Sequence, residues 1–254
     1  MNKTTNVQDL FREGKLAESI QALSVEVRDN PTDNRCRTFL FELLCFAGDF
    51  QRAGKHLNML FDASPDAAVG GLVYRSALSA ERKRQAFFEA KQYEGPDIAP
   101  PPPRPGKLNG EPFQTIEDID SRIGARLEVF IAGEYVWLPF ARIGSLTMSA
   151  PRFLRDLLWS SAVVTAGPAL AGKEFGEVLV PVLYPFSHVH PKDNVKLGRE
   201  TDWVQPKDEM SEVPYGQKLL VLDGERAVPF LEIRSLQFDD AVAPGNGESS
   251  SDPS

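Results

Sequence analysis

Two histidines and a glycine-rich segment are the residues whose types and spacing could support chemistry. His188 and His190 are separated by one residue, so a strand could place both imidazoles on one side, with Asp193 nearby. A zinc site would need a third protein ligand. Pro191 follows and the loop is hydrophilic, so the favoured interpretation is that both histidines are solvated or structurally hydrogen-bonded.

The glycine-rich segment, Gly167–Lys173, matches the first seven positions of a phosphate-binding loop. The eighth position is Glu174, which lacks a magnesium-binding hydroxyl and would repel phosphate, and Gly176 opens a strand-like run where the motif needs a helix. Neither Cys36 nor Cys45 has a histidine partner in a catalytic pattern, and there is no nucleophile elbow. We therefore expect a non-enzymatic protein without metal or cofactor. A metal- or nucleotide-dependent enzyme using these two loops is the alternative.

A third segment, Leu197–Trp203, has the composition of an interface. It is loop-like and contains an arginine, an acid and one of the three tryptophans of the chain. Arginine and tryptophan are the residues that most often anchor protein interfaces. The structural alternative is that Arg199 pairs with Asp202 and that Trp203 closes a barrel. We predict a partner site on this loop and on the end of the preceding strand, at Tyr184, Phe186, Arg199, Asp202 and Trp203.

These residues belong to an acidic chain of 254 residues with a formal net charge of −8. Residues 1–95 carry 13 basic and 13 acidic side chains, whereas residues 96–254 carry 15 and 23. This excess of carboxylates disfavours binding to nucleic acid or to an anionic membrane. The one basic cluster, Arg82–Arg84, is expected to be a solvated helix face. The start of the chain has no apolar signal region, no window could span a membrane, and two thiols in an apolar pattern fit a reducing cytoplasm.

The first third of the chain repeats itself with a period of 34 residues, which is the period of TPR helix pairs. Gly14 aligns with Gly48, and Asn30 aligns with Ser64. We expect both glycines to follow helix ends, and Asn30 and Ser64 to be N-caps, each followed by a proline at the first helical position. Helices are predicted near residues 5–13, 15–29, 32–47, 50–62 and 65–93.

This helical part should present a binding surface. Helix 32–47 is apolar on nearly every side, which predicts a central position in the array. Helical arrays of this kind usually offer a concave groove to a peptide or a helix. The last helix ends with Phe87 and Phe88, and adjacent positions on a helix could direct one ring to the array and the other to a second domain. We expect two separately cored domains in contact.

The remainder of the chain changes in character. Residues 96–106 are proline-rich and predict a stiff linker after a helical domain at 1–95. Residues 107–238 have the pattern of a β-rich domain, and residues 239–254 that of a disordered tail. The fold class is therefore α+β multidomain, with a TPR-like helical array followed by a small, barrel-like β domain.

Within the β-rich part a strand–turn–strand unit occurs twice. Leu127–Phe140 and Leu219–Phe230 each turn at a glycine, end in Pro-Phe and are followed by Ile-x-Ser-Leu. The duplication predicts a small barrel or sandwich with internal pseudo-symmetry. Phe175–Tyr184 is predicted as another strand and Pro151–Ser161 as a short amphipathic helix.

The order of these motifs resembles one family. A short helical array is followed by P-F-x-x-I-x-S-L, L-V-P-V-L-Y-P, L-G-R-x-T-D-W and Q-x-L-L-V-x-D-G-E. This is similar to the ImpE/SciE family, also called TagJ, of type VI secretion clusters, over essentially residues 8–238. The resemblance implies a cytoplasmic, non-enzymatic accessory protein. It also implies two partners, namely the N-terminal helix of the small sheath subunit (TssB/VipA-like) and the ClpV-type AAA+ ATPase. A general TPR scaffold without a secretion role is the alternative.

Overall fold

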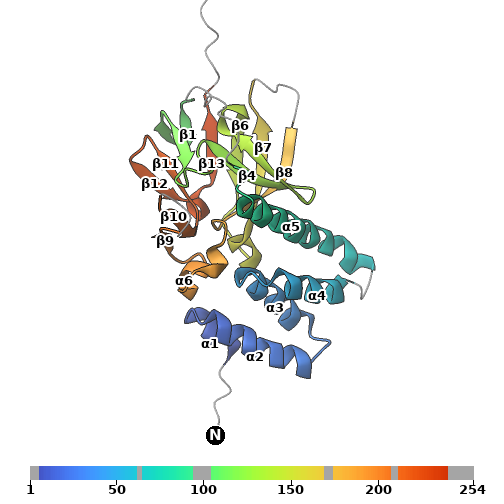
Figure 1. Cartoon of the computed structure of the whole chain (residues 1–254). Coiled ribbons are helices and arrows are strands. Elements are labelled where there is room, and N and C mark those ends of the chain that lie inside the picture. Colours follow the sequence, from blue (N-terminus) through green and yellow to red (C-terminus); the bar gives the residue numbers. More distant parts are fainter. Residues whose placement is uncertain (1–5, 62–64, 94–103, 169–173, 207–210, 240–254) are drawn as a thin grey trace, which may run out of the picture.

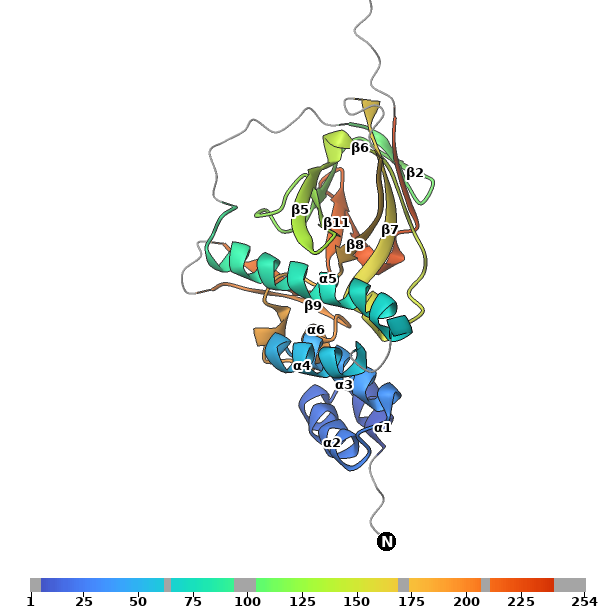
Figure 2. The ribbon, with the colours of Figure 1, turned by 90° about the vertical axis from the view of Figure 1, so that its right-hand side faces the viewer.

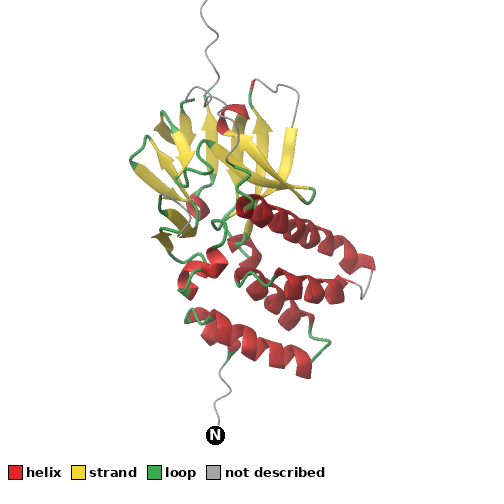
Figure 3. Ribbon diagram, in the orientation of Figure 1, coloured by secondary structure: helices red, strands yellow, loops and turns green. Residues whose placement is uncertain are grey.

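The computed structural model describes residues 6–61, 65–93, 104–168, 174–206 and 211–239. Helices occupy the N-terminal part and strands most of the rest, with the long helix α5 lying between the other helices and the sheet (Figures 1 and 3). The helices of the array are α1 Val7–Arg12, α2 Leu16–Asp29, α3 Asn34–Phe46, α4 Phe50–Phe61 and α5 Pro65–Glu89. All five predicted helices are present, and each packs against the next one.

Helix α3 is the central element of the array, as predicted. Residues from Leu40 to Phe46 are all buried, and the helix packs on both α2 and α4. Its predicted start was wrong. Asp33, not Asn30, is the N-cap, because its carboxylate accepts hydrogen bonds from the backbone N–H of Arg35 (2.9 Å) and of Cys36 (3.0 Å). Asn30 instead ends α2, and Ser64 lies outside the described residues.

The strands form one eight-stranded sheet and two smaller ones. Their bounds are β1 Gly106–Leu108, β2 Glu111–Phe113, β3 Ile116–Asp118, β4 Arg126–Ile131, β5 Glu134–Pro139, β6 Ile143–Met148, β7 Trp159–Ala166, β8 Glu174–Pro181, β9 Thr201–Val204, β10 Val213–Gly216, β11 Leu219–Leu222, β12 Arg226–Pro229 and β13 Ser235–Phe238. The large sheet has the order β2-β1-β13-β6-β7-β8-β4-β5, with β12-β11-β3 and β10-β9 beside it. The large sheet curves but leaves β2 and β5 as open edges, so the prediction of a barrel was wrong (Figure 2).

The predicted duplication is present. The β4–β5 and β11–β12 hairpins both turn through two residues with positive φ, and each leads through a short 3-10 turn toward β6 or β13. Strands β6 and β13 then pair with each other in antiparallel fashion, with Leu146 opposite Leu236. These two leucines are equivalent in the two copies, so the copies meet through their equivalent strands.

One predicted helix is absent. Residues 151–161 form a 3-10 turn at Leu154–Leu157 and then enter strand β7 at Trp159. The Asp156 carboxylate accepts the backbone N–H of Arg152 (2.8 Å) and of Phe153 (2.9 Å), which holds the turn. Strand β7 then pairs along its length with β8, and this pairing outweighs the apolar helical spacing.

The array and the sheet share one connected hydrophobic core, so the expectation of two separate cores was wrong. Helix α5 packs on β4 and β5. Phe87 and Phe88 do not diverge as expected, because both rings contact Trp137 of β5, with centroid distances of 5.1 and 6.2 Å. The domain boundaries stay a prediction, since residues 94–103 of the linker region and 240–254 lie outside the described residues. Among the described helices, none is long and apolar enough to cross a membrane.

Candidate functional site

The loop that was predicted to bind a partner contacts the first two helices of the array. Arg199 donates hydrogen bonds to the carbonyl oxygens of Phe11 (2.6 Å) and Arg12 (3.0 Å) at the carboxyl end of α1. Its guanidinium also lies 5.0 Å from the centre of the Phe11 ring. Asp193, at the start of the short helix α6 Asp193–Lys196, accepts the backbone N–H of Leu16 (2.9 Å). Both contacts join the β-rich part to the turn between α1 and α2.

Side chains of the β-rich part pack directly against the two glycines of the 34-residue repeat. Both have positive φ, 79° at Gly14 and 72° at Gly48. A Cβ on Gly14 would lie 2.5 Å from Oδ1 of Asn194, and a Cβ on Gly48 would overlap the imidazole ring of His188. His188 also packs edge-on against Phe50. His188 therefore has a packing role at the second turn of the array, which explains one of the two unassigned histidines.

The second histidine and Asp202 form a local polar cluster. Asp202 pairs with Lys192 (2.7 Å) and lies 3.5 Å from Nε2 of His190, whose Nδ1 accepts the backbone N–H of Lys192. Asp202 thus does not pair with Arg199, and Trp203 is 40% exposed on β9 rather than closing a barrel. No three His, Cys, Asp or Glu side chains gather into a possible metal site in the part of the chain that the structure describes. Residues 169–173 of the glycine-rich segment are outside that part.

The remaining two predicted site residues connect strands and helices inside the molecule. Tyr184 is 1% exposed, and its hydroxyl donates to the carbonyl and accepts the N–H of Leu219. Phe186 has a left-handed backbone (φ 61°), and its N–H donates to the side chain of Gln85 on α5 (3.2 Å). Trp203 therefore offers the clearest exposed apolar surface of the five. A partner-binding role for all five stays a prediction.

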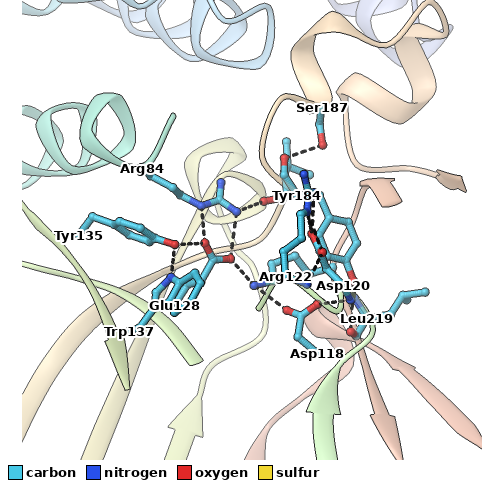
Figure 4. A network of polar contacts seen from close by, with 12 residues as sticks. Arg84, Asp118, Asp120, Arg122, Glu128, Tyr135, Trp137, Tyr184, Ser187 and Leu219 are labelled. Carbon is cyan, nitrogen blue, oxygen red and sulfur yellow. Dashed lines mark hydrogen bonds and ion pairs between the residues drawn. The ribbon is translucent and has the colours of Figure 1, made fainter. Parts of the chain in front are cut away.

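Buried charged side chains connect α5 to the sheet (Figure 4). The sequence analysis did not predict this cluster. Arg84 is 1% exposed, so the interpretation of Arg82–Arg84 as a solvated face was wrong at this residue. Its Nε and Nη2 donate to the Glu128 carboxylate at 2.7 and 3.0 Å. Lys218 pairs with the same carboxylate, and its Nζ lies 2.8 Å from Asp118 Oδ2 without hydrogen-bond geometry. The sequence did contain a signal for this cluster, because Glu128 is a charged residue inside an otherwise apolar strand.

The pKa values in this cluster reflect burial and pairing. Burial alone would raise the pKa of Glu128, but Arg84 and Lys218 outweigh it and lower the pKa to about 2. Burial dominates at Asp118, whose pKa rises to about 6 although Lys218 opposes the shift. The cluster is compensated and enclosed, which suits a structural connection between α5 and the sheet rather than a ligand site.

An open groove lies where the array meets the β-rich part. It has a volume of about 740 Å³, and its walls come from α1, α3, α5 and the turn before β7. It is lined by Gln8, Phe11, Asn34, Arg35, Cys36, Thr38, Phe39, Glu42, Tyr74, Phe153, Leu154 and Arg155. Four of these residues are aromatic, and Phe153 is 56% exposed. The sequence analysis expected a concave groove on the helical array, whereas this groove is shared between the array and the turn before β7.

Among the described residues that line the groove, Glu42 is the one carboxylate. It is 8% exposed, and burial raises its pKa to about 7, with a smaller contribution from Asp156. Arg155 opposes the shift through its charge and its backbone N–H. The Arg155 guanidinium is itself engaged, because it donates to the Tyr74 hydroxyl (3.1 Å) and lies 3.5 Å from Asp156. Among the described residues, no side chain forms an ion pair with Glu42.

The fold and the groove define a class of protein in which a helical array and a curved sheet share one core and form a composite surface trough. The model of the ImpE protein family matches residues 110–237. The chain is 30% identical to the type VI secretion system accessory component TagJ of Pseudomonas aeruginosa, over 91% of this chain and 90% of that relative. The chain therefore belongs to the ImpE family, which confirms the resemblance and supports an accessory role in type VI secretion.

A solved structure shares the fold. The crystal structure of protein VPA1032 from Vibrio parahaemolyticus matches with a TM-score of 0.79 and 25% sequence identity. The match covers 94% of this chain and 99% of that chain. The combination of helical array and open sheet is therefore found in an experimentally determined protein over nearly its whole length.

Proposed function

We propose that this chain is a non-enzymatic adaptor of the type VI secretion system, and that its groove binds the N-terminal helix of the small contractile-sheath subunit. The composite groove is the observation that carries this proposal. Its volume falls within the range of about 300–1,000 Å³ that is usual for ligand sites. An amphipathic helix binds by placing its apolar face in such a trough, with a few polar groups fixing its position. The aromatic lining and Glu42 meet both requirements.

Association with the ClpV-type AAA+ ATPase is the second part of the proposal and rests on the family alone. The exposed ribbon of β9 and β10, with Trp203 and Val204 at 40% and 39% exposure, is a separate surface that this second partner could use. We also propose that the adaptor acts in the cytoplasm, where sheath subunits and their ATPase would meet.

The test compares two exposed aromatic residues. A labelled peptide with the N-terminal helix of the small sheath subunit from the same gene cluster is titrated with wild type, Phe153→Ala and Trp203→Ala. We expect Phe153→Ala to weaken binding roughly 30-fold, the effect of losing an anchor of about 2 kcal/mol, with an unchanged melting temperature. Trp203→Ala should bind like wild type. The reverse result would move the site to the loop predicted from sequence, and absence of binding by wild type would refute the helix-binding function.

A further inference from the structure

The groove has a chemical asymmetry that constrains what it can bind. Its walls are mainly apolar and include four aromatic side chains, and among the described residues its charged side chains are Arg35, Arg155 and a single carboxylate, Glu42. A carboxyl group that is more than nine-tenths buried normally has a charged or hydrogen-bonding side-chain partner. Glu42 accepts the backbone N–H of Arg155, but no side chain in the described part of the chain forms an ion pair with it. The free protein therefore leaves an acceptor at the groove that a ligand can use.

Lysine and arginine are the side chains that fit such a site. Their aliphatic stems pack against apolar surfaces while the charged end reaches a polar partner. Aromatic faces attract cations, and a carboxylate forms its strongest hydrogen bonds with them. The aromatic faces nearby already accept a cation in this chain, since the Arg155 guanidinium lies 5.3 Å from the Tyr74 ring centre and 5.0 Å from that of Phe153.

We infer that the helix bound in this groove presents one lysine or arginine within its apolar face, and that this cation pairs with Glu42. The inference rests on the proposed function and specifies it further, because Glu42 becomes the residue that selects among amphipathic helices. A helix with an uncharged side chain at that position would leave a buried carboxylate without a cationic partner, which carries a free-energy cost.

The experiment is a double-mutant cycle with the sheath-subunit peptide. Each lysine and arginine of the peptide is replaced in turn by norleucine, and affinities are measured for wild type, Glu42→Gln and Glu18→Gln. Glu18 is an exposed acid on α2 outside the groove, so its variant controls for the change in net charge. We expect one replacement in the peptide to weaken its binding to wild type at least tenfold. The same replacement should have little effect on binding to Glu42→Gln. The Glu42→Gln variant should itself bind the parent peptide at least tenfold more weakly than wild type does.

The pH dependence of binding gives a second readout. Pairing with a cation requires Glu42 to be ionised, so the affinity of wild type should fall between pH 8 and pH 6, whereas that of Glu42→Gln should change far less. The other charged or titratable groups that act on Glu42 are Arg155 and Asp156 from the turn before β7, Tyr74 from α5, and Cys45 from its own helix. Glu42→Gln retains all of them.

The outcomes separate this inference from the proposed function. If wild type and Glu42→Gln bind the parent peptide within twofold of each other, the role of Glu42 is refuted while helix binding stands. The same conclusion follows if no single replacement in the peptide distinguishes the two proteins. If wild type does not bind the peptide at all, the proposed function fails and this inference fails with it. Melting curves of Glu42→Gln show whether a loss of binding reflects unfolding.

Discussion

At the scale of single residues, the chain contains two kinds of buried acid. Glu128 is fully buried and surrounded by Arg84, Lys218 and the Tyr135 hydroxyl, which donates to it at 2.6 Å. Glu42 is almost as buried but has no cationic side chain paired with it among the described residues. The first arrangement holds the fold together. In the second arrangement, the charge state of Glu42 depends on the pH and on any bound partner.

Lys218 should be far more important for stability than its exposed counterpart Lys83. Lys218→Met leaves two buried carboxylates, Glu128 and Asp118, with one fewer cation, and breaking a buried pair costs about 3–5 kcal/mol. Lys83 pairs with Glu134 on the surface, where such a pair contributes about 0–1 kcal/mol. Urea unfolding of both methionine variants measures the difference. Similar losses of unfolding free energy in the two variants would contradict the structural role of the buried cluster.

Glu42 should make stability depend on pH in the opposite sense to a paired acid. Its pKa is raised to about 7 in the folded protein from 4.5, so the folded state binds more protons than the unfolded state between these values. Unfolding free energy therefore falls as pH rises from about 4.5 to about 7. Glu42→Gln should match wild type near pH 4.5 and be more stable near pH 8, by an amount on the order of 1–3 kcal/mol. A difference that does not change with pH would refute this account.

At the scale of elements, helix positions were predictable because caps and apolar periodicity are local. All five helices of the array and both hairpins follow from such signals. The start of α3 was misplaced because Asn30 and Asp33 are both good N-caps, and sequence alone does not rank them. The region from Pro151 to Ser161 was misread because pairing of β7 with β8 overrides a short helical spacing. Closure of the sheet was also unpredictable, since it depends on whether β2 and β5 meet.

The turn at Gly48 should tolerate a methyl group worse than other turns of the same geometry. Gly48 and Gly224 have nearly equal φ values, 72° and 73°, so alanine costs both positions about 1–2 kcal/mol of backbone strain. A Cβ at Gly224 meets nothing within 4 Å, whereas at Gly48 it overlaps His188. Gly48→Ala should therefore lower the melting temperature more than Gly224→Ala. Adding His188→Ala should recover part of the loss, and equal effects at both glycines would refute the packing role of His188.

At the scale of the whole molecule, the existence of a groove could be predicted from the helical array. The residues that line it could not. Phe11 and Tyr74 come from the array, and Phe153 comes from the turn before β7. Their proximity depends on contacts between residues far apart in sequence, such as Leu16 with Asp193. Glu42 did carry a local signal, as an acid within an apolar helix. The Arg199 loop was recognised as unusual, but its role in positioning α1 appeared only in three dimensions.

Arg199 should control the groove from outside it. Its two hydrogen bonds fix the carboxyl end of α1, and Phe11 on that helix lines the groove. Hydrogen bonds to a charged group contribute about 1.5–3 kcal/mol, so Arg199→Ala should speed hydrogen exchange of α1 amides roughly 10- to 100-fold. Exchange in β6 and β7 should not change, because the sheet core does not depend on this contact. Peptide binding should weaken together with the loosening of α1.

A matched control for this variant is Arg28→Ala on α2, where the guanidinium is exposed and pairs only with its neighbour Asp29 among the described residues. It should leave both exchange and binding unchanged. If Arg199→Ala weakens binding while α1 exchanges at the wild-type rate, Arg199 contacts the partner directly, as the sequence alone predicted. If α1 loosens but binding persists, the groove does not need α1, and the partner helix lies closer to α3 and Phe153.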